Sequence, residues 1–397
     1  MSVRRKIVIS TAIASFMMLF CYFITNMDWP ISGEQQVMSF CDEYLDWRKN
    51  DKMNDSVLFV NVSYDLELTD KLGKSMNDKD TIGNTAIADR NKLYNLLCFF
   101  DSLENPPFIL LDIFFEKGIK TPIDDKLFSL INRMPHILVP YGGDSKDTLE
   151  DKRLHNKAYI AEYYPTIFQS SFVKYPYYPN SIKSLPLVMY EDKYLCGGKL
   201  NDYCLFYTDN GYLARKSVVL NFECEPADSI IHNLGELVGP DNLFKDEPDL
   251  ASRKYVVIGS FYERDMHNTY KKEKVSGTVI LFNAYLALLH GQHILSYCIG
   301  ALLFMMFFVY SYLILSRRTL CDIISNNLKP TKEWAKIIRA SLLVICYWFG
   351  FPACLTVVCA FTYLAEGKTY DILITSVAIQ LIKMIVDLYY KRIELKI

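Results

Sequence analysis

The sequence lacks both an excess of positive charge and a polybasic tract. Its 43 Lys and Arg residues are matched by 45 Asp and Glu residues, which gives a formal net charge of −2 at pH 7. Proteins that bind nucleic acid carry a basic stripe or patch, because contacts to phosphates supply much of their affinity. The charge balance therefore gives no support to a nucleic-acid partner.

The sequence also lacks the familiar motifs of enzymes. It has no glycine-rich phosphate loop, no nucleophile elbow and no zinc-protease helix. Gly142-Gly-Asp144 matches only the start of a cyclase signature, and we interpret it as a turn. His290 and His293 have no third ligand near them in the sequence, so we favour an interfacial pair over a metal site. We predict a protein that is not an enzyme and that holds neither a metal nor a cofactor.

Apolar residues are abundant: 51% of the chain is hydrophobic and only 22% is charged. Four segments have about the length of a helix that crosses a bilayer, one near the N-terminus and three in the C-terminal quarter: 7–24, 294–315, 340–364 and 372–388. The first follows basic residues, as a signal peptide would. However, Tyr22, Phe23 and Asn26 stand where a cleavage site needs small residues, so we predict an uncleaved anchor.

Basic residues near these segments set the expected orientation. They are concentrated in the loop between the second and third spans and after the fourth: Arg317, Arg318, Lys329, Lys332, Lys336, Arg339, Lys391, Arg392 and Lys396. By the positive-inside rule, both termini lie in the cytosol. We expect an N-terminal anchor (1–26), an extracytoplasmic domain (27–293), three spans (294–390) with a basic cytosolic loop (316–339), and a cytosolic tail (391–397).

The region between the first two spans predicts alternating strands and helices. Its strongest strand signal is Phe108 to Phe115, an almost unbroken apolar run that is typical of a strand buried on both faces. Asp89 caps a helix that precedes this strand and follows an earlier strand at 57–63. The other expected elements are a loop at 70–87, helices at 124–134, 227–237 and 277–291, and strands at 137–139 and 255–259. The predicted fold class is α/β: a three-layer extracytoplasmic domain with four transmembrane helices.

Polar residues follow the predicted strands, where ligands bind in an open α/β sheet. Asp65, Asp112 and Asp265 come at or after the ends of strands, and Arg90 opens the intervening helix. These four residues are our candidate ligand pocket. The competing interpretation, which we favour, is an internal network such as an Arg90–Asp112 ion pair between helix and strand. Under that interpretation, Asp112→Asn destabilises the fold.

Five cysteines fall in the expected extracytoplasmic region, where an oxidising compartment permits disulfides. Cys196 and Cys204 bracket Gly197-Gly198 at a spacing that suits a bridged hairpin, and we predict a disulfide between them. Cys98 lies near the apolar face of its helix, so we expect it in the core.

The fourth span carries Gln380, Lys383 and Asp387 on one helical face. Ionisable residues inside a membrane are candidates for function by default, although Lys383 is near enough to the cytosolic end to snorkel. Gly350-Phe-Pro352 predicts a kink in the third span.

Several short motifs occur in a characteristic order: Gly83 with Asp89-Arg90, Leu111-Asp-Ile-Phe-Phe115, Val257-Ile-Gly259 with Asp265 and Thr269, and Gly277-Thr-Val-Ile-Leu-Phe-Asn-Ala284 with Leu288-Leu-His-Gly291. With one span before them and three after, they resemble the CHASE2 family of extracytoplasmic sensory modules. The chain departs from the family at Asn84-Thr-Ala-Ile-Ala88, which replaces a Trp-Pro-rich approach to the Asp-Arg pair. It also has no kinase, cyclase or similar output domain after its spans.

The resemblance implies a sensory function in the bacterial inner (cytoplasmic) membrane. The expected cytosolic segments are too short to bury a core, so we expect the output to pass to a separate membrane or cytosolic protein. The predicted function is a non-enzymatic sensor or receptor subunit whose extracytoplasmic domain binds a ligand or an envelope protein. The alternative is a structural subunit of an envelope complex, which the Tyr- and Pro-rich stretch 157–194 favours because aromatic residues are common at interfaces. Self-association into a homo-oligomer is compatible with both.

Overall fold

The computed structural model describes these residues: 1–27, 34–45, 56–72, 81–142, 146–161, 164–165, 171–203, 206–239, 244, 248–262, 265–269, 274–316, 333–370 and 373–394. The chain divides into two units. We call them the helical unit (1–47, 212–219 and 292–397) and the α/β unit (48–211 and 220–291).

A six-stranded parallel sheet forms the centre of the α/β unit, with the strand order β13-β1-β14-β4-β5-β6. Its strands are β1 (Val57–Asn61), β4 (Phe108–Leu111), β5 (Ile137–Tyr141), β6 (Ala158–Ile160), β13 (Ile231–Asn233) and β14 (Tyr255–Gly259). Every residue of β1, β4, β5 and β14 is buried, which is the pattern of parallel strands that are covered on both faces.

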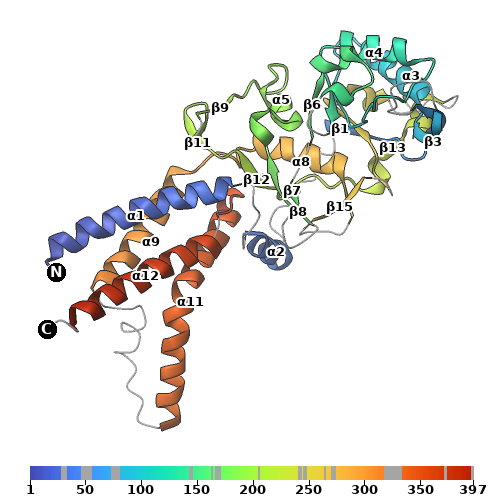
Figure 1. Ribbon diagram of the computed structural model, residues 1–397. Helices are drawn as coiled ribbons and strands as arrows, with labels where there is room; N and C mark the ends of the chain where they lie inside the picture. The colour runs from blue at the N-terminus through green and yellow to red at the C-terminus, as the bar shows by residue number, and fades with distance from the viewer. Residues whose placement is uncertain are drawn as a thin grey trace. The chain divides into compact units, whose positions relative to one another are not determined.

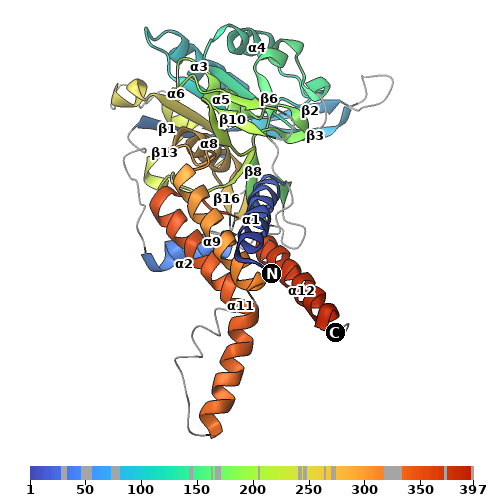
Figure 2. The same ribbon diagram turned by 90° about the vertical axis from the view of Figure 1, so that its left-hand side faces the viewer.

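Helices cover both faces of this sheet (Figures 1 and 2). One face packs against α3 (Arg90–Asp101), α4 (Asp124–Arg133) and α6 (Leu234–Val238). On the other face, α8 (Gly277–Leu289) places Phe282 edge-on against Phe59 of β1, with ring centroids 6.2 Å apart. The helix α5 (Leu185–Glu191) packs against α8. These layers confirm the predicted α/β class with its parallel sheet.

Shorter strands complete the α/β unit: β7 (Tyr164–Pro165), β8 (Ser171–Pro176), β9 (Leu200–Asp202), β10 (Tyr207–Asp209), β15 (Met266–Thr269) and β16 (Val275–Ser276). A further pair, β2 (Leu66–Leu72) and β3 (Thr81–Ala88), is antiparallel. The prediction of a loop over 70–87 is therefore wrong in part. The hairpin buries little apolar surface, since Leu68 is 77% exposed, so the sequence carries no buried face to reveal it.

Two other expected elements differ from the structure. The predicted helix at 227–237 is a 3₁₀ turn at Asp228–Ile230, then β13, then the short helix α6. Parallel pairing of β13 with β1 satisfies the backbone of this segment and overrides its helical pattern. The predicted strand at 108–115 ends at Leu111, although the amide of Asp112 still donates to the carbonyl of Ile258 at 2.7 Å.

In the described part of the helical unit, three helices are long and apolar enough to cross a membrane: α1 (Val3–Asn26), α9 (Tyr297–Leu315) and the segment Phe349–Glu366 of α11 (Glu333–Glu366). The fourth predicted span forms the helix α12 (Leu373–Glu394), but it is not among these three, so a fourth span stays a prediction. The helical unit also contains α2 (Glu34–Leu45).

The helices α1 and α9 run antiparallel. The Lys6 ammonium, at the start of α1, donates to the hydroxyl of Ser316, at the end of α9, at 3.2 Å. The start of α1 and the end of α12 lie at the same end of the helical unit (Figures 1 and 2). That both termini lie on one side of a membrane, in the cytosol, stays a prediction.

Candidate functional site

Polar side chains gather at the edge of the sheet where β1, β14 and β4 end. Asp112 directly follows β4, and Thr278 lies in the first turn of α8. The Thr278 hydroxyl donates to Asp112 Oδ2 at 2.6 Å, which ties the start of α8 to the end of the strand. Because both groups belong to buried elements, the backbone fixes this contact in place.

Two glycines let α8 begin this close to the sheet. A Cβ atom at Gly259, the last residue of β14, would lie 2.1 Å from Thr278 Oγ1. A Cβ atom at Gly277 would lie 2.1 Å from Asp265 Oδ2. Real Cβ atoms do not approach other atoms so closely, so these positions require glycine if Thr278 and Asp265 are to keep their places.

Asp265 brings a second carboxylate to the same edge. Its backbone carbonyl accepts from the Gly277 amide at 2.9 Å, and its φ is +55°, a left-handed conformation that Asp tolerates better than most residues. Its carboxylate contacts His267 Nε2 at 2.8 Å, and 49% of its side chain is exposed. The predicted residues Asp112 and Asp265 thus come together, with His267 and Thr278 beside them.

The protonation of Asp112 responds to this environment. Burial raises its pKa to about 7; the negative charge of Asp265 also raises the pKa, whereas the Thr278 hydroxyl and His267 lower it. The side chain keeps some accessible surface, although protein atoms surround the carboxyl group closely. A carboxyl group that titrates near neutral pH in a cluster of ionisable groups is a feature of functional sites, although structural networks also show it.

Asp65 serves the internal structure instead. It accepts hydrogen bonds from Lys92 Nζ at 2.6 Å and from the Gly235 amide at 2.9 Å. These two bonds tie the start of α3 to the start of α6. Both carboxylate oxygens are therefore engaged within the fold.

Arg90 is also engaged within the fold. It is 3% exposed, its Nη1 lies 2.5 Å from Asp124 Oδ2, and its guanidinium carbon lies 5.4 Å from the centre of the Phe115 ring. The predicted Arg90–Asp112 pair is therefore wrong: Arg90 joins α3 to the start of α4. The idea of an internal network is confirmed for Arg90 and Asp65, with partners other than those predicted.

The two site residues that sequence reasoning missed are Thr278 and His267. Thr278 follows Gly277 at the start of an apolar helix and lies within the family motif, a position that could have marked it. His267 has no comparable signal, because a histidine two residues after an aspartate marks no site by itself.

The cysteine predictions have different outcomes. Cys98 packs against the main apolar core, as expected. The sulfur of Cys196 lies 3.7 Å from the Tyr285 hydroxyl. Cys204 falls outside the described residues, so the Cys196–Cys204 disulfide stays a prediction. Gly143 and Asp144 also fall outside them.

Metal binding has no geometric support in the part of the chain that the structure describes, where no group of three or more His, Cys, Asp or Glu residues could hold an ion. His290 instead forms an ion pair with Glu223. The Glu223 carboxylate, as a hydrogen-bond partner, raises the pKa of His290.

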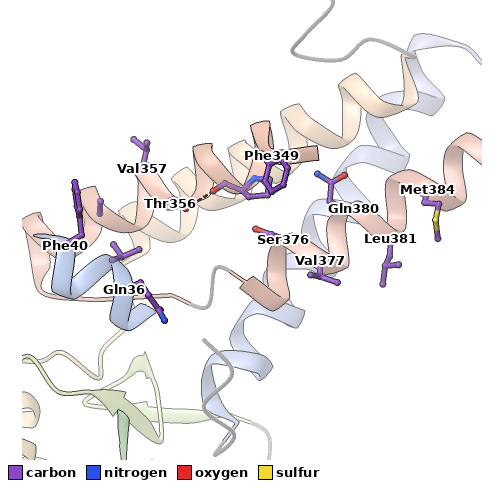
Figure 3. Close-up of a pocket in the computed structure, with 13 residues that line it drawn as sticks. Gln36, Phe40, Phe349, Thr356, Val357, Ser376, Val377, Gln380, Leu381 and Met384 are labelled. Atoms are coloured by element: carbon purple, nitrogen blue, oxygen red, sulfur yellow. Dashed lines mark hydrogen bonds between the residues drawn. The ribbon is translucent and has the colours of Figure 1, made fainter. Parts of the chain in front are cut away.

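A large cavity of about 990 Å³ lies in the helical unit, along α2, α11 and α12 (Figure 3). Its lining is mostly apolar, and the Thr356 hydroxyl donates internally to the Pro352 carbonyl at 2.9 Å. Gln380 points its amide to the Tyr310 hydroxyl at 3.4 Å, and Lys383 is 5% exposed, so its side chain is buried rather than extended to solvent. The exposed apolar wall of this cavity is what lipid-facing helices present, so it indicates no particular ligand.

Comparison of the chain with protein-family models, with curated proteins and with solved structures finds no match. The resemblance to the CHASE2 family therefore rests on the motifs and the expected spans, and it stays a hypothesis.

Proposed function

We propose that this chain is a non-enzymatic membrane sensor or receptor subunit. Its α/β unit lies outside the cytoplasmic membrane and binds a ligand or an envelope protein at the sheet edge around Asp112 and Asp265. Its spans pass the signal to a separate membrane or cytosolic protein. The observation that supports the proposal is the hydrogen bond between Asp112 and Thr278, because Thr278 belongs to α8.

The helix α8 is the element that follows the site and precedes a candidate span. It is buried over almost its whole length, and the chain then passes through residues 290–296 to reach α9. A ligand that competes for Asp112 acts on the first turn of α8. Because this connection is short, it has few residues that could absorb a movement of α8 before the movement reaches α9.

The carboxyl groups define the chemistry of the ligand. Asp112 and Asp265 offer acceptor oxygens, and His267 and Thr278 offer polar atoms next to them. A ligand that carries a cation or several hydrogen-bond donors matches this set.

The test is affinity purification of the full chain from native membranes in a neutral detergent, with wild type beside Thr278→Val. We expect a signalling protein, such as a kinase or cyclase, to co-purify with the wild type, and its amount to change in the variant. Thr278→Ser keeps the hydroxyl and serves as the matched control. If only transport or cell-wall proteins co-purify, in equal amounts from all three, the chain is a structural subunit and the sensor proposal is wrong.

The structural alternative was favoured by the Tyr- and Pro-rich stretch 157–194, much of which is buried. Tyr175 and Tyr177, at the centre of the Tyr- and Pro-rich stretch, are fully buried, and Tyr178 and Tyr190 are 8% and 7% exposed. These four side chains contribute to the interior of the α/β unit, whereas Tyr194 of the same stretch is 46% exposed. The structural alternative is therefore weaker than the sensor proposal, and the purification distinguishes the two.

A further inference from the structure

A buried arginine that has no acidic partner among the described residues lies in the helical unit. Arg215, between β11 (Tyr212–Ala214) and β12 (Ser217–Val219), is 2% exposed. Its Nη1 and Nη2 atoms donate to the backbone carbonyls of Thr369 at 2.7 Å and Gln292 at 2.5 Å. Among the described residues no carboxylate forms an ion pair with it, and its Nε atom is buried without a hydrogen-bond partner.

This arrangement is costly for an arginine, because a buried cation is normally paired with an anion. Two carbonyl dipoles and the ring of Tyr370, whose centre is 5.6 Å from the guanidinium carbon, compensate only part of the charge. The position therefore has an electrostatic deficit that an anion would fill.

Arg215 lines a cavity of about 470 Å³. The rest of the lining comes from α1, β11, α9 and the segment before α12, and it is mostly apolar: Met18, Cys21, Tyr22, Thr25, Leu213, Leu295, Ser296, Tyr297, Gly300, Ala301, Leu303, Phe304, Met305 and Tyr370. The volume falls within the range of small-molecule sites. A cation at an otherwise apolar cavity matches a ligand with an anionic group and a hydrocarbon chain.

Tyrosines place this cavity at the end of the candidate spans. Tyr22 is in the last part of α1, its hydroxyl donating to the Ala214 carbonyl at 3.0 Å, and Tyr297 is the first residue of α9. The ring of Tyr297 lies 6.1 Å from that of Tyr212, and both side chains are at least half exposed. Tyrosine is enriched where helices leave the hydrocarbon, at the level of lipid headgroups.

We propose that this cavity binds a single anionic phospholipid, with its phosphate at Arg215 and part of an acyl chain between α1 and α9. A phosphate oxygen accepts from the free Nε–H, a charge-assisted bond that the guanidinium geometry favours. A zwitterionic lipid would leave the cationic site only partly compensated, and a free anion would leave the apolar wall uncovered. This proposal is independent of the sensor function.

The test uses the full chain, stripped of lipid in a neutral detergent and titrated with phosphatidylglycerol or with phosphatidylethanolamine of the same acyl chains. Native mass spectrometry counts the bound lipid. We expect phosphatidylglycerol to bind at least about tenfold more tightly. Equal affinity for the two lipids overturns the proposal, as does displacement of phosphatidylglycerol by millimolar inorganic phosphate alone, which would identify a free-anion site.

Two variants separate the charge from the cavity. Arg215→Gln should abolish the preference for the anionic lipid, but it also removes contacts to Thr369 and Gln292. Gly300→Phe leaves Arg215 in place: a Cβ atom there meets only the Met18 side chain, at 3.9 Å, so the ring extends into the cavity.

We expect Gly300→Phe to weaken binding of phosphatidylglycerol at least about tenfold while its unfolding midpoint stays that of the wild type. Leu302→Phe places the same ring on an exposed position of α9, 43% exposed and outside the cavity lining, and should bind as the wild type does. Undiminished binding by a folded Gly300→Phe variant overturns the proposal.

Discussion

Thr278 and Asp112 are joined by a 2.6 Å hydrogen bond that connects the first turn of a buried helix to the end of a buried strand. The hydroxyl is the donor, so the bond is strongest when Asp112 is ionised. Burial acts in the opposite direction and favours the protonated acid. The contact between α8 and the sheet therefore depends on pH.

The stability of the protein should fall as pH rises from about 4 to about 7 because of Asp112. Its folded pKa of about 7 lies above the ordinary value of 3.8, so the folded state holds a proton that the unfolded state has lost. Asp112→Asn keeps an acceptor for Thr278 but cannot ionise. We expect it to remove this slope and to raise stability at pH 8 by about 1–2 kcal/mol, less than the full shift implies because the side chain keeps some solvent contact.

Thermal unfolding of the full chain in detergent, followed by circular dichroism between about pH 5 and pH 8, measures this slope. Asp265→Asn serves as a second variant. It removes a like charge and so lowers the pKa of Asp112, and the fall in stability should then end at a lower pH. An Asp112→Asn variant that is less stable than wild type at pH 8 would contradict the prediction. It would instead support the destabilisation that the sequence alone led us to expect.

Removal of the Thr278 hydroxyl should have a complementary effect. Thr278→Val keeps the shape of the side chain, so the ionised Asp112 loses its donor and its pKa rises further. We expect a loss of about 1–2 kcal/mol at pH 8 and a smaller loss at pH 5, where the acid is protonated. Thr278→Ser should lie close to the wild type. In the Asp112→Asn background, the loss of stability caused by Thr278→Val should no longer depend on pH. If that loss still depends on pH, a group other than Asp112 is responsible.

Two ion pairs between α3 and α4 allow a matched comparison. Arg90 and Asp124 join the starts of the two helices, with side chains 4% and 11% exposed. Arg133 and Asp101 join their ends, with side chains 68% and 27% exposed. Asp124→Asn leaves a buried guanidinium uncompensated, for which we expect a loss of about 3 kcal/mol. Asp101→Asn should cost about 0–1 kcal/mol. Equal losses in urea unfolding would show that burial does not set the strength of these pairs.

The sequence predicted the four strands of the parallel sheet that are buried throughout, because burial on both faces leaves a continuous apolar run such as Phe108–Leu111; it missed the edge strands β6 and β13. It also predicted the start of α3, where the Asp89 carboxylate accepts from the amides of Asn91 and Lys92 at 3.0 Å. Both signals are local. An exposed hairpin such as β2–β3 buries no regular face and leaves no such pattern.

The candidate site was predicted only in part, because its contacts depend on strand order. The latest of these strands, β14, inserts between β1 and β4, and this brings α8 and Thr278 to Asp112. Nothing local in the sequence fixes that order. Arg90 is likewise followed by several aspartates, Asp112 and Asp124 among them, and the packing of α4 against α3 selects Asp124.

The end of α8 should show a second pH dependence, distinct from that of Asp112. The hydrogen bond to the Glu223 carboxylate raises the pKa of His290 above 6.5, so this pair stabilises the fold below pH 6.5 and the contribution is lost as pH rises through the raised value. Glu223→Gln should cost about 1 kcal/mol at pH 6, a modest value because the His290 side chain is 34% exposed, and almost nothing at pH 9. The same unfolding experiments separate the two pH dependences. Glu223→Gln should change how stability varies with pH above pH 6.5, whereas Asp112→Asn should change how stability varies with pH below about 7. A Glu223→Gln variant whose loss is equal at pH 6 and pH 9 would show that Glu223 acts through packing and not through the charge of His290.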